Sequence, residues 1–389
     1  MVLYKKKLNF AVAGSYSNAG ATGTVVDDAT NGVLTVTAPI NTTTRARVTT
    51  VAAANMPTLL GSNFGAFRLK FTTTVPNSIK TLSVYISLDT AYTVSGYFKV
   101  SAGNFILGLN EVVLGWDDFV PPAGKTVDDF KMAQILSWQV SLASSTTEAS
   151  TIGLISFDGI QKGTGAVVFM ADDGNVEQFT IMHQLLQNAG FLGAMTVAII
   201  PAKINTPNYM TSAQLKEMNS ACAVIGNHTF NHVILGNETE AVQRQELSWC
   251  YDWLNDSGLG NYPDYIIYPQ GNYNQATLDI VRTKYSIGRT VKEGMITPTA
   301  DKTQLKIINL LPNVTAETVK KYIDRATTDG VGVIFLMHRL MENEPDANTP
   351  TTFWVTSRLQ EVIDYARMKG APVMNLKSFV TTFLKDNEE

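Results

Sequence analysis

Several residue types are scarce in this chain of 389 residues, and each shortage excludes a class of protein. Two cysteines, Cys222 and Cys250, are too few for a disulfide framework. No apolar run reaches the length of a membrane-spanning helix, so we expect no membrane partner. The net charge is −4 and no basic stripe is present, which argues against a nucleic-acid partner.

A secretory signal is also missing, because the basic start Met1-Val-Leu-Tyr-Lys-Lys-Lys7 is not followed by an apolar stretch. We therefore expect a protein that is cytoplasmic as expressed. The other expectation is a virion-associated protein that acts at a host cell surface.

A change of composition near residue 163 divides the chain, which is too long for one ordinary core. Residues 1–162 are rich in Thr, Val, Ala, Ser and Asn, and segments such as Phe67-Arg-Leu-Lys-Phe-Thr72 alternate apolar and polar residues. Short alternating strands predict an all-β sandwich, jelly-roll-like, at residues 1–162. The segments 137–142 and 152–157 are expected to form its closing hairpin-like pair.

Residues 163–389 change to a strand, loop, helix rhythm. Ala166-Val-Val-Phe-Met170 is a continuous apolar run, as expected for a parallel strand that is buried on both faces. An amphipathic segment, 177–187, follows it. Repeated units of this kind predict an α/β domain with a parallel sheet, open or closed into a barrel.

Four candidate functional positions follow predicted strands. They are Asp172-Asp173, His228, Pro269 and His338. Because active sites of such folds lie at the carboxyl ends of the strands, we expect these positions to share one rim.

Two carboxylates and two imidazoles are enough for a divalent metal site with one acid left over as a base. The chain has four histidines, and two of them stand four residues apart in His228-Thr-Phe-Asn-His232. Each motif alone has a plainer explanation. Ala171-Asp-Asp-Gly174 also suits a turn that ends a strand. A His-x-x-x-His pair also suits two surface histidines on a helix.

The order of these motifs resembles the polysaccharide deacetylase family, the group with the NodB homology domain (carbohydrate esterase family 4). The family's Thr-Phe-Asp-Asp-Gly motif is similar to Met170-Ala-Asp-Asp-Gly174, and its His-Ser/Thr-x-x-His motif matches residues 228–232 in full. A strand ending in Leu-x-His is matched by Leu336-Met-His338. The resemblance covers about residues 164–384 and implies a distorted (β/α)7-type barrel.

By position, the resemblance implies that Asp172 is the general base. It implies that Asp173, His228 and His232 bind one divalent metal, zinc first, with cobalt or nickel as alternatives. His338 is the implied general acid. The segment from Pro269 to Tyr273 is similar to a Tyr-Pro-Tyr-Gly variant of a further motif. It implies substrate or oxyanion contacts from Pro269, Gln270, Gly271 and Tyr273.

Two departures from the family pattern concern the groups that orient the base and assist the acid. Ile267 stands where the family usually has the arginine that orients the base, and no Asp-x-x-Asp-Trp motif is present. Arg289, on the next predicted strand, is a candidate for the missing cation. The family's general-acid histidine normally has an acidic partner, and no residue of this sequence can be named as that partner of His338.

Tryptophans near these motifs receive separate predictions. Trp249 and Trp253 are four residues apart on a predicted helix, which favours core packing. Trp354 follows a rim motif, as Tyr273 does, and is a candidate substrate contact.

The leading hypothesis is a metal-dependent hydrolase that removes N- or O-linked acetyl groups from an acetylated polysaccharide. The alternative is a catalytically weak or inactive glycan-binding or virion structural protein with a deacetylase-like domain. The N-terminal sandwich suits carbohydrate binding, or attachment to a larger assembly such as a virion, as in a phage tail protein.

Overall fold

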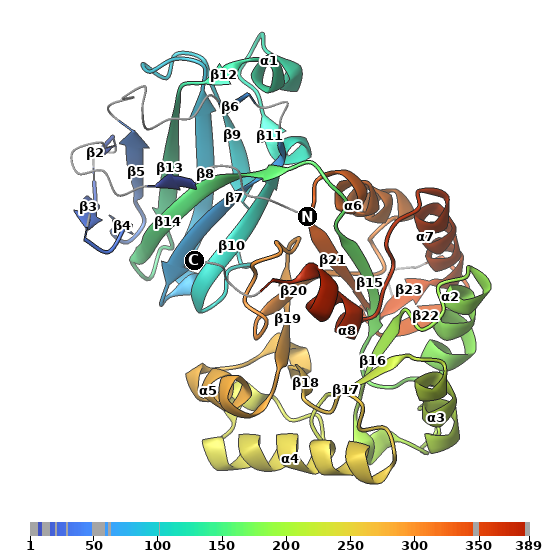
Figure 1. The fold of residues 1–389 in the computed structure, drawn as a ribbon. Helices are drawn as coiled ribbons and strands as arrows, with labels where there is room; N and C mark the ends of the chain where they lie inside the picture. The colour runs from blue at the N-terminus through green and yellow to red at the C-terminus, as the bar shows by residue number, and fades with distance from the viewer. Residues whose placement is uncertain are drawn as a thin grey trace. The chain divides into compact units, whose positions relative to one another are not determined.

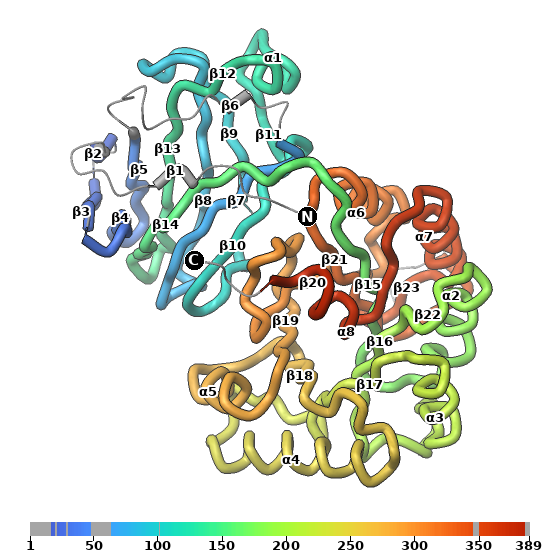
Figure 2. The backbone as a smooth tube through the Cα atoms, viewed as in Figure 1, coloured from blue at the N-terminus to red at the C-terminus, as the bar shows by residue number. Residues whose placement is uncertain are grey.

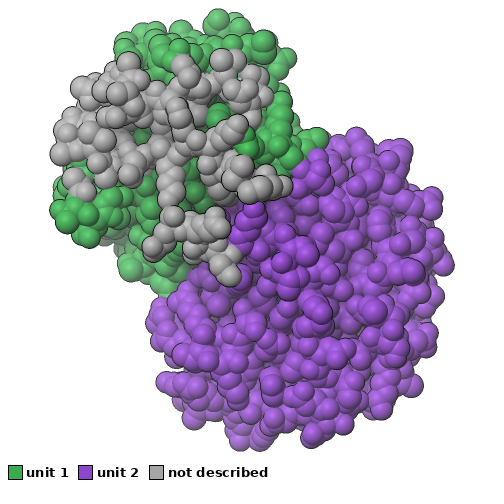
Figure 3. All heavy atoms as spheres, viewed as in Figure 1, with its two compact units in different colours: residues 1–163, 328–330 green, residues 164–327, 331–389 purple. Residues whose placement is uncertain are grey.

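The computed structural model describes residues 7–9, 16–19, 22–28, 30–48, 59–60, 64–100, 102–344 and 350–385. The chain divides into two compact units, which Figure 3 shows in different colours. Residues 1–163 and 328–330 form the N-terminal unit, and residues 164–327 and 331–389 form the C-terminal unit.

The described part of the N-terminal unit contains two antiparallel six-stranded sheets (Figure 1). The first has the order β10 (Gly108–Gly115), β7 (Phe64–Thr73), β14 (Ser150–Gln161), β4 (Val33–Ala38), β3 (Thr24–Asp28), with β1 (Lys7–Asn9) also paired to β14. The second has the order β11 (Phe119–Val120), β9 (Ser95–Val100), β8 (Ile79–Ser87), β13 (Ser137–Ser144), β5 (Thr43–Val48), β2 (Tyr16–Asn18). The remaining elements are helix α1 (Val127–Met132) and the pair β6 (Leu59–Leu60) and β12 (Gln134–Ile135).

Alternating residues of both sheets build one core. Val36 of β4 and Val84 of β8 are fully buried and belong to the same apolar cluster, although their strands lie in different sheets. Two antiparallel sheets that share one core form a sandwich. The all-β prediction for this region is therefore confirmed, whereas the jelly-roll connectivity stays a prediction.

The predicted closing hairpin is wrong. β13 pairs with β5 and β8 in one sheet, whereas β14 pairs with β4 and β7 in the other. The connection at residues 145–149 crosses from one sheet to the other. Adjacency in sequence therefore does not produce pairing here.

The C-terminal unit is built on a closed barrel of seven parallel strands, in chain order. The strands are β15 (Ala166–Ala171), β16 (Met195–Ile199), β17 (Val224–Asn227), β18 (Tyr265–Ile267), β19 (Ile287–Glu293), β20 (Leu305–Asn309) and β21 (Gly332–Met337). Every residue of β15 is buried, as its continuous apolar run predicts. The register between β19 and β20 shifts between Arg289 and Glu293, which distorts the barrel there. This is the (β/α)7-type arrangement that the resemblance implies.

Helices connect most of the barrel strands, as the tube in Figure 2 shows, whereas β19 leads to β20 without one. They are α2 (Gln184–Asn188), α3 (Ser212–Ser220), α4 (Glu240–Asp256), α5 (Gln275–Lys284), α6 (Ala316–Thr328), α7 (Thr356–Met368) and α8 (Leu376–Ser378). The expected helix at 177–187 begins as a π-helical turn, Gln178–His183, and a second such turn, Phe379–Phe383, follows α8. The short strands β22 (Arg339–Met341) and β23 (Phe353–Val355) pair in parallel. Among the helices of the described residues, none combines the length and apolar composition that crossing a bilayer requires.

Candidate active site at the carboxyl ends of the barrel strands

The two aspartates lie immediately after β15. The Asp172 amide donates to the carbonyl oxygen of Met337 at 3.0 Å, which ties the end of β15 to β21. Asp173 has φ of +79° and Gly174 has φ of +81°, so the chain turns sharply through the left-handed region. As a result the two carboxylates differ in environment. Asp172 is 2% exposed, whereas the Asp173 side chain is 23% exposed.

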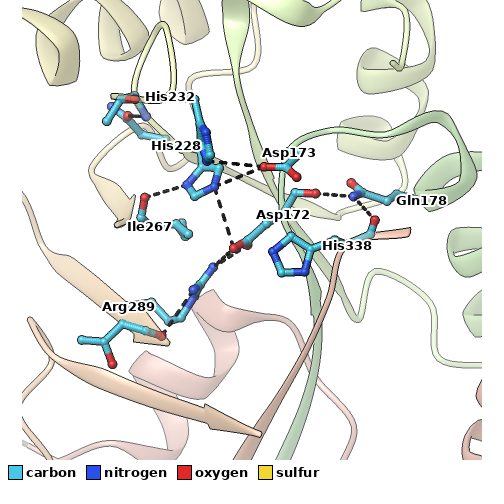
Figure 4. A network of polar contacts seen from close by, with 11 residues as sticks. Asp172, Asp173, Gln178, His228, His232, Ile267, Arg289 and His338 are labelled. Carbon is cyan, nitrogen blue, oxygen red and sulfur yellow. Dashed lines mark hydrogen bonds and ion pairs between the residues drawn. The ribbon is translucent and has the colours of Figure 1, made fainter. Parts of the chain in front are cut away.

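Asp173, His228 and His232 form a cluster of three metal-binding side chains, seen in Figure 4. One oxygen of Asp173 lies 3.5 Å from His228 Nε2 and 3.6 Å from His232 Nε2. Two ligand atoms that bind one tetrahedral zinc ion at about 2.1 Å lie about 3.4 Å apart. The donor set and its spacing therefore fit a divalent metal, with a coordination position left open.

A hydrogen bond fixes the orientation of His228. Its Nδ1 lies 2.8 Å from the carbonyl oxygen of Ile267, so the ring nitrogen that carries the proton donates to the end of β18. The Nε2 atom then presents its lone pair toward Asp173. A second ring nitrogen held in this way is the usual support of a metal-binding imidazole.

Electrostatics keep this cluster in the protonation states that a cation requires. Burial alone raises the pKa of Asp173, but contact with His228 and the charges of the three nearby histidines outweigh it and lower that pKa to about 2. Burial, and then the neighbouring His228, lower the pKa of His232. The cluster therefore favours a carboxylate beside a neutral imidazole, which is the form that binds metal.

Arg289 lies against Asp172. Its guanidinium contacts both carboxylate oxygens, and the arginine side chain is fully buried. Arg289 is the register partner of Ile267 on the neighbouring strand, the position where the family arginine is expected. Arg289, on β19, thus supplies the positive charge beside the candidate base Asp172, because β18 carries Ile267 instead of an arginine. Oδ2 of Asp172 is also 3.8 Å from His228 Nε2, so the carboxylate lies beside the metal cluster.

His338 follows β21, and Figure 4 shows its imidazole beside Asp172. Gln178, in the π-helical turn, donates to the backbone oxygens of both His338, at 2.8 Å, and Asp172. Figure 4 shows Gln178 spanning these two strand ends. A single buried amide therefore joins the loops of the candidate acid and the candidate base. Local π turns often occur at functional sites, and sequence periodicity did not reveal this one.

The segment from Pro269 to Tyr273 contacts the scaffold on one side. Gly271 has φ of +63°, and a Cβ there would lie 2.4 Å from Val291, so only glycine fits. Gln270 is exposed and left-handed, with φ of +53°. The Tyr273 hydroxyl donates to Gln304 at 2.8 Å. The proposed substrate contact of Tyr273 therefore falls to its ring.

Two tryptophan predictions are wrong. Trp354 is fully buried and its Nε1 donates to the carbonyl oxygen of Val314 at 2.9 Å, so it is a packing residue and not a substrate contact. Trp249 is 46% exposed, beside Phe230, rather than in the core. The buried side of α4 consists of other residues, namely Gln243, Glu246, Leu247, Cys250 and Leu254.

Glu246 is a residue that sequence reasoning missed. It is 5% exposed, and its two carboxylate oxygens accept from the backbone amide and the side-chain amide of Asn231, at 2.8 and 2.7 Å. Asn231 stands directly before His232, whose φ is +64°. Such backbone conformations cost of order 1–3 kcal/mol each for non-glycine residues and persist where surrounding contacts hold them. The sequence pattern that could have revealed this role is the position of Glu246, an acid on the same side of its helix as the apolar residues Leu247, Cys250 and Leu254.

The same helix holds the loop at a second point. Asn227 donates to the carbonyl oxygen of Leu247 at 2.9 Å and accepts from the amide of Thr229, which is also left-handed, at 3.0 Å. Helix α4 therefore hydrogen-bonds with both the beginning and the end of the segment that carries His228 and His232.

Comparisons with known proteins find relatives of the C-terminal unit. A family model described as polysaccharide deacetylase matches residues 160–285. A curated protein of Bacillus subtilis (strain 168), named "Putative polysaccharide deacetylase YxkH", is 26% identical over 159 residues, which are 41% of this chain and 56% of that protein. This chain thus aligns with about half the length of that relative.

The solved structures that match include the Streptococcus pyogenes deacetylase PplD in complex with acetate. It is 26% identical, with a TM-score of 0.36, over 40% of this chain and 68% of that one. The Bc1960 peptidoglycan N-acetylglucosamine deacetylase is 19% identical, with a TM-score of 0.40, over 59% of this chain and 93% of that one.

Proposed function

We propose that the protein hydrolyses acetyl groups on a polysaccharide and releases acetate, because residues 160–285 match the polysaccharide deacetylase family model. The observation that carries this proposal is the cluster of Asp173, His228 and His232 beside Asp172, which a fully buried arginine holds.

The proposed metal site consists of Asp173, His228 and His232. Two imidazoles and one carboxylate suit zinc, and they also suit cobalt or nickel. A divalent ion bound there acts as a Lewis acid toward the acetyl carbonyl and makes a bound water more acidic. We assign the proton transfers and the contact with the oxyanion to residues of the chain.

Asp172 is the proposed general base. Arg289 contacts both of its oxygens and so orients the carboxylate, which lies 3.8 Å from His228 Nε2. In the reaction, Asp172 takes one proton from water as the water oxygen bonds to the acetyl carbon. The backbone amide of Gln270 is proposed to donate to the oxygen that becomes negative.

His338 is the proposed general acid. As the bond from the acetyl carbon to the sugar nitrogen or oxygen breaks, His338 gives a proton to the leaving amine or alkoxide. Acetate and a free sugar group are the products. Gln178 donates to the backbone oxygens of Asp172 and His338 and so holds together the two strand ends that carry these side chains.

Acetate release from a panel of acetylated glycans tests this function. The panel includes an N-acetylated amino-sugar oligosaccharide and an O-acetylated xylan, each with its chemically deacetylated form as the control. We expect zinc-, cobalt- or nickel-loaded protein to release acetate from at least one acetylated member and from none of the controls. No release from any member, with any of the three metals, would favour the inactive glycan-binding alternative.

The contact between Glu246 and Asn231 yields a prediction about metal affinity. Replacing Glu246 with Ala frees the segment before His232, and the loss of such outer contacts typically lowers metal affinity by about 10–100-fold. Glu246→Gln retains one of the two acceptor oxygens, so a smaller loss is expected. Competition with a zinc-chelating dye measures the dissociation constant directly.

Glu240→Gln is the matched control for this measurement. Glu240 is an exposed acid on the same helix, and it pairs only with Arg244 among the contacts described. The zinc affinity of the Glu240→Gln protein should equal that of the wild type. If folded Glu246→Ala protein also binds zinc with wild-type affinity, Glu246 has no positioning role.

A further inference from the structure

His338 differs from the other residues of the proposed reaction in how its side chain is held. Arg289 contacts both carboxylate oxygens of Asp172, and the carbonyl oxygen of Ile267 lies 2.8 Å from Nδ1 of His228. By contrast, none of the residues that the structure describes hydrogen-bonds with the half-buried imidazole of His338, as Figure 4 shows. The position of this ring therefore depends on the backbone that carries it.

Gln178 binds that backbone directly. It is 2% exposed, and its side-chain nitrogen donates to the backbone oxygen of His338 at 2.8 Å and to that of Asp172. Both partners are carbonyl oxygens, which only accept hydrogen bonds. The amide of Gln178 must therefore present its NH2 group to them, and an ionised carboxylate could not take its place.

The preceding residue, Glu177, makes a second link to the same strand end. Its Oε1 atom accepts from the guanidinium of Arg339, with Nε at 3.2 Å. Arg339 stands directly after His338, and its amide donates to the carbonyl oxygen of Thr352 at 3.0 Å. Its guanidinium also lies 4.8 Å from the centre of the Phe353 ring. Arg339 is thus held at both its backbone and its side chain.

Both links come from the beginning of the π-helical turn Gln178–His183. The amide of Gln178 donates to the carbonyl oxygen of Asn175 at 3.1 Å, which fixes the start of this turn. Adjacent residues of a regular helix do not face the same neighbour. Here, Glu177 and Gln178 nevertheless contact two consecutive residues, 338 and 339, one through a side chain and one through the backbone.

These contacts concern the acid more than the base. A general acid must lie within hydrogen-bond reach of the atom that it protonates, and a misplacement of about 1 Å can cost on the order of 100-fold in rate. Asp172 keeps its contact with Arg289 if Gln178 is lost. The ring of His338 has no such support among the described residues, so we expect it to move first.

We propose that Gln178 and the Glu177–Arg339 ion pair are positioning residues for the general acid. They hold His338 through its main chain and so place its imidazole against the leaving nitrogen or oxygen. As the bond from that atom to the acetyl carbon breaks, the proton passes from the imidazole to the leaving atom, and the positioning residues exchange no proton. This inference rests on the proposed function, because it concerns the acid step of that reaction.

The leaving group provides the test. A sugar amine or alkoxide must be protonated as it leaves, whereas para-nitrophenolate is stable as an anion and needs no acid. Gln178→Met removes both hydrogen bonds and keeps a side chain of similar length. In the zinc-loaded full-length chain, we expect kcat for the most active acetylated glycan to fall by about 10–100-fold with little change in KM. The kcat for para-nitrophenyl acetate should stay at the wild-type value.

Variants of Glu177 make the test independent of the buried amide, because Gln178→Met leaves two buried carbonyl oxygens without this donor. Glu177→Ala should lower kcat for the glycan several-fold and leave the aryl ester unaffected. Glu177→Gln can still accept from Arg339 and should retain most of the activity. Gln184→Met is the matched control, since Gln184 is an exposed glutamine at the start of α2, and it should behave as the wild type on both substrates.

A double-mutant cycle shows which proton-transfer group Gln178 acts through. In His338→Ala protein, Gln178→Met should add little to the loss on the glycan, because the acid that Gln178 positions is absent. Equal losses on the glycan and on the aryl ester would overturn the proposal. A full Gln178→Met loss in the His338→Ala background would do the same, since it would assign the effect to Asp172 or to the fold.

A measurement without turnover separates this inference from the proposed function. The chain has four histidines, so NMR spectra of protein with isotope-labelled imidazoles can be assigned, and the His338 signal is the one that disappears in His338→Gln. In zinc-loaded protein, Gln178→Met should shift or broaden that signal and leave those of His228 and His232 in place. An unchanged His338 signal would contradict the positioning role. Wild-type protein that releases acetate from no glycan would contradict the proposed function, and the His338 signal would still decide whether Gln178 holds this ring.

Discussion

Replacing Asp172 with Asn is expected to lower kcat for acetate release by about 10²–10⁴-fold, the usual worth of general acid–base catalysis. The asparagine has the same shape and can still accept a hydrogen bond from Arg289, so the fold should survive. It cannot take a proton from water. Because Asp172 is not one of the three clustered metal ligands, zinc affinity should remain close to wild type. Steady-state kinetics with a parallel zinc titration measure both quantities.

Asp252→Asn is the control for this substitution, since Asp252 is an exposed acid on the outer side of α4. It should have no effect on kcat. The roles of the two aspartates also separate in this experiment: Asp173→Asn should weaken zinc binding, whereas Asp172→Asn should not. Acetate release by Asp172→Asn within a few-fold of wild type would exclude Asp172 as the base.

Replacing Arg289 with Ala is expected to reduce both stability and kcat. Arg289 and Asp172 are both buried, at 0% and 2% exposure, and removal of one partner from a buried ion pair costs about 3–5 kcal/mol. The carboxylate also loses the contact that orients it. Arg289→Lys should recover part of the stability but little of the activity, because an ammonium cannot replace a planar guanidinium that contacts two oxygens.

A double-mutant cycle measures the coupling between Arg289 and Asp172. In the Asp172→Asn background, Arg289→Ala should cost much less stability than in the wild type, since no unpaired carboxylate is left. Arg282→Ala serves as the control, because it removes an exposed ion pair with Asp301, which is typically worth less than about 1 kcal/mol. Wild-type acetate release by Arg289→Ala would exclude Arg289 as the residue that orients the base.

The sequence predicted the location of the site because a parallel barrel has simple geometry. Strands that run in the same direction end on one edge, so Asp172, His228 and His338 are brought to the same rim once each is recognised at a strand end. Arg289 was found by the same reasoning, one strand further along. The contact between Arg289 and Asp172 is present in the structure, while its catalytic role stays a prediction.

Other features depend on contacts that no local pattern encodes. Glu246 reaches Asn231 across fifteen positions, and Gln178 joins residues from two strands, so both required the packed structure. The four-residue spacing of Trp249 and Trp253 suggested a shared buried face. The apolar stripe of α4 lies on a different side, and Trp249 is left exposed. Helical periodicity identifies a face but does not determine which neighbour covers it.

The central claim is that acetyl hydrolysis depends on a divalent metal bound by Asp173, His228 and His232. The most direct measurement is acetate release by metal-free protein before and after one equivalent of zinc, on the panel member with the highest activity. We predict no release before zinc, recovery at one equivalent, and no recovery for His232→Gln protein at the same zinc concentration. Equal acetate release from wild-type protein shown to contain no metal would contradict the account.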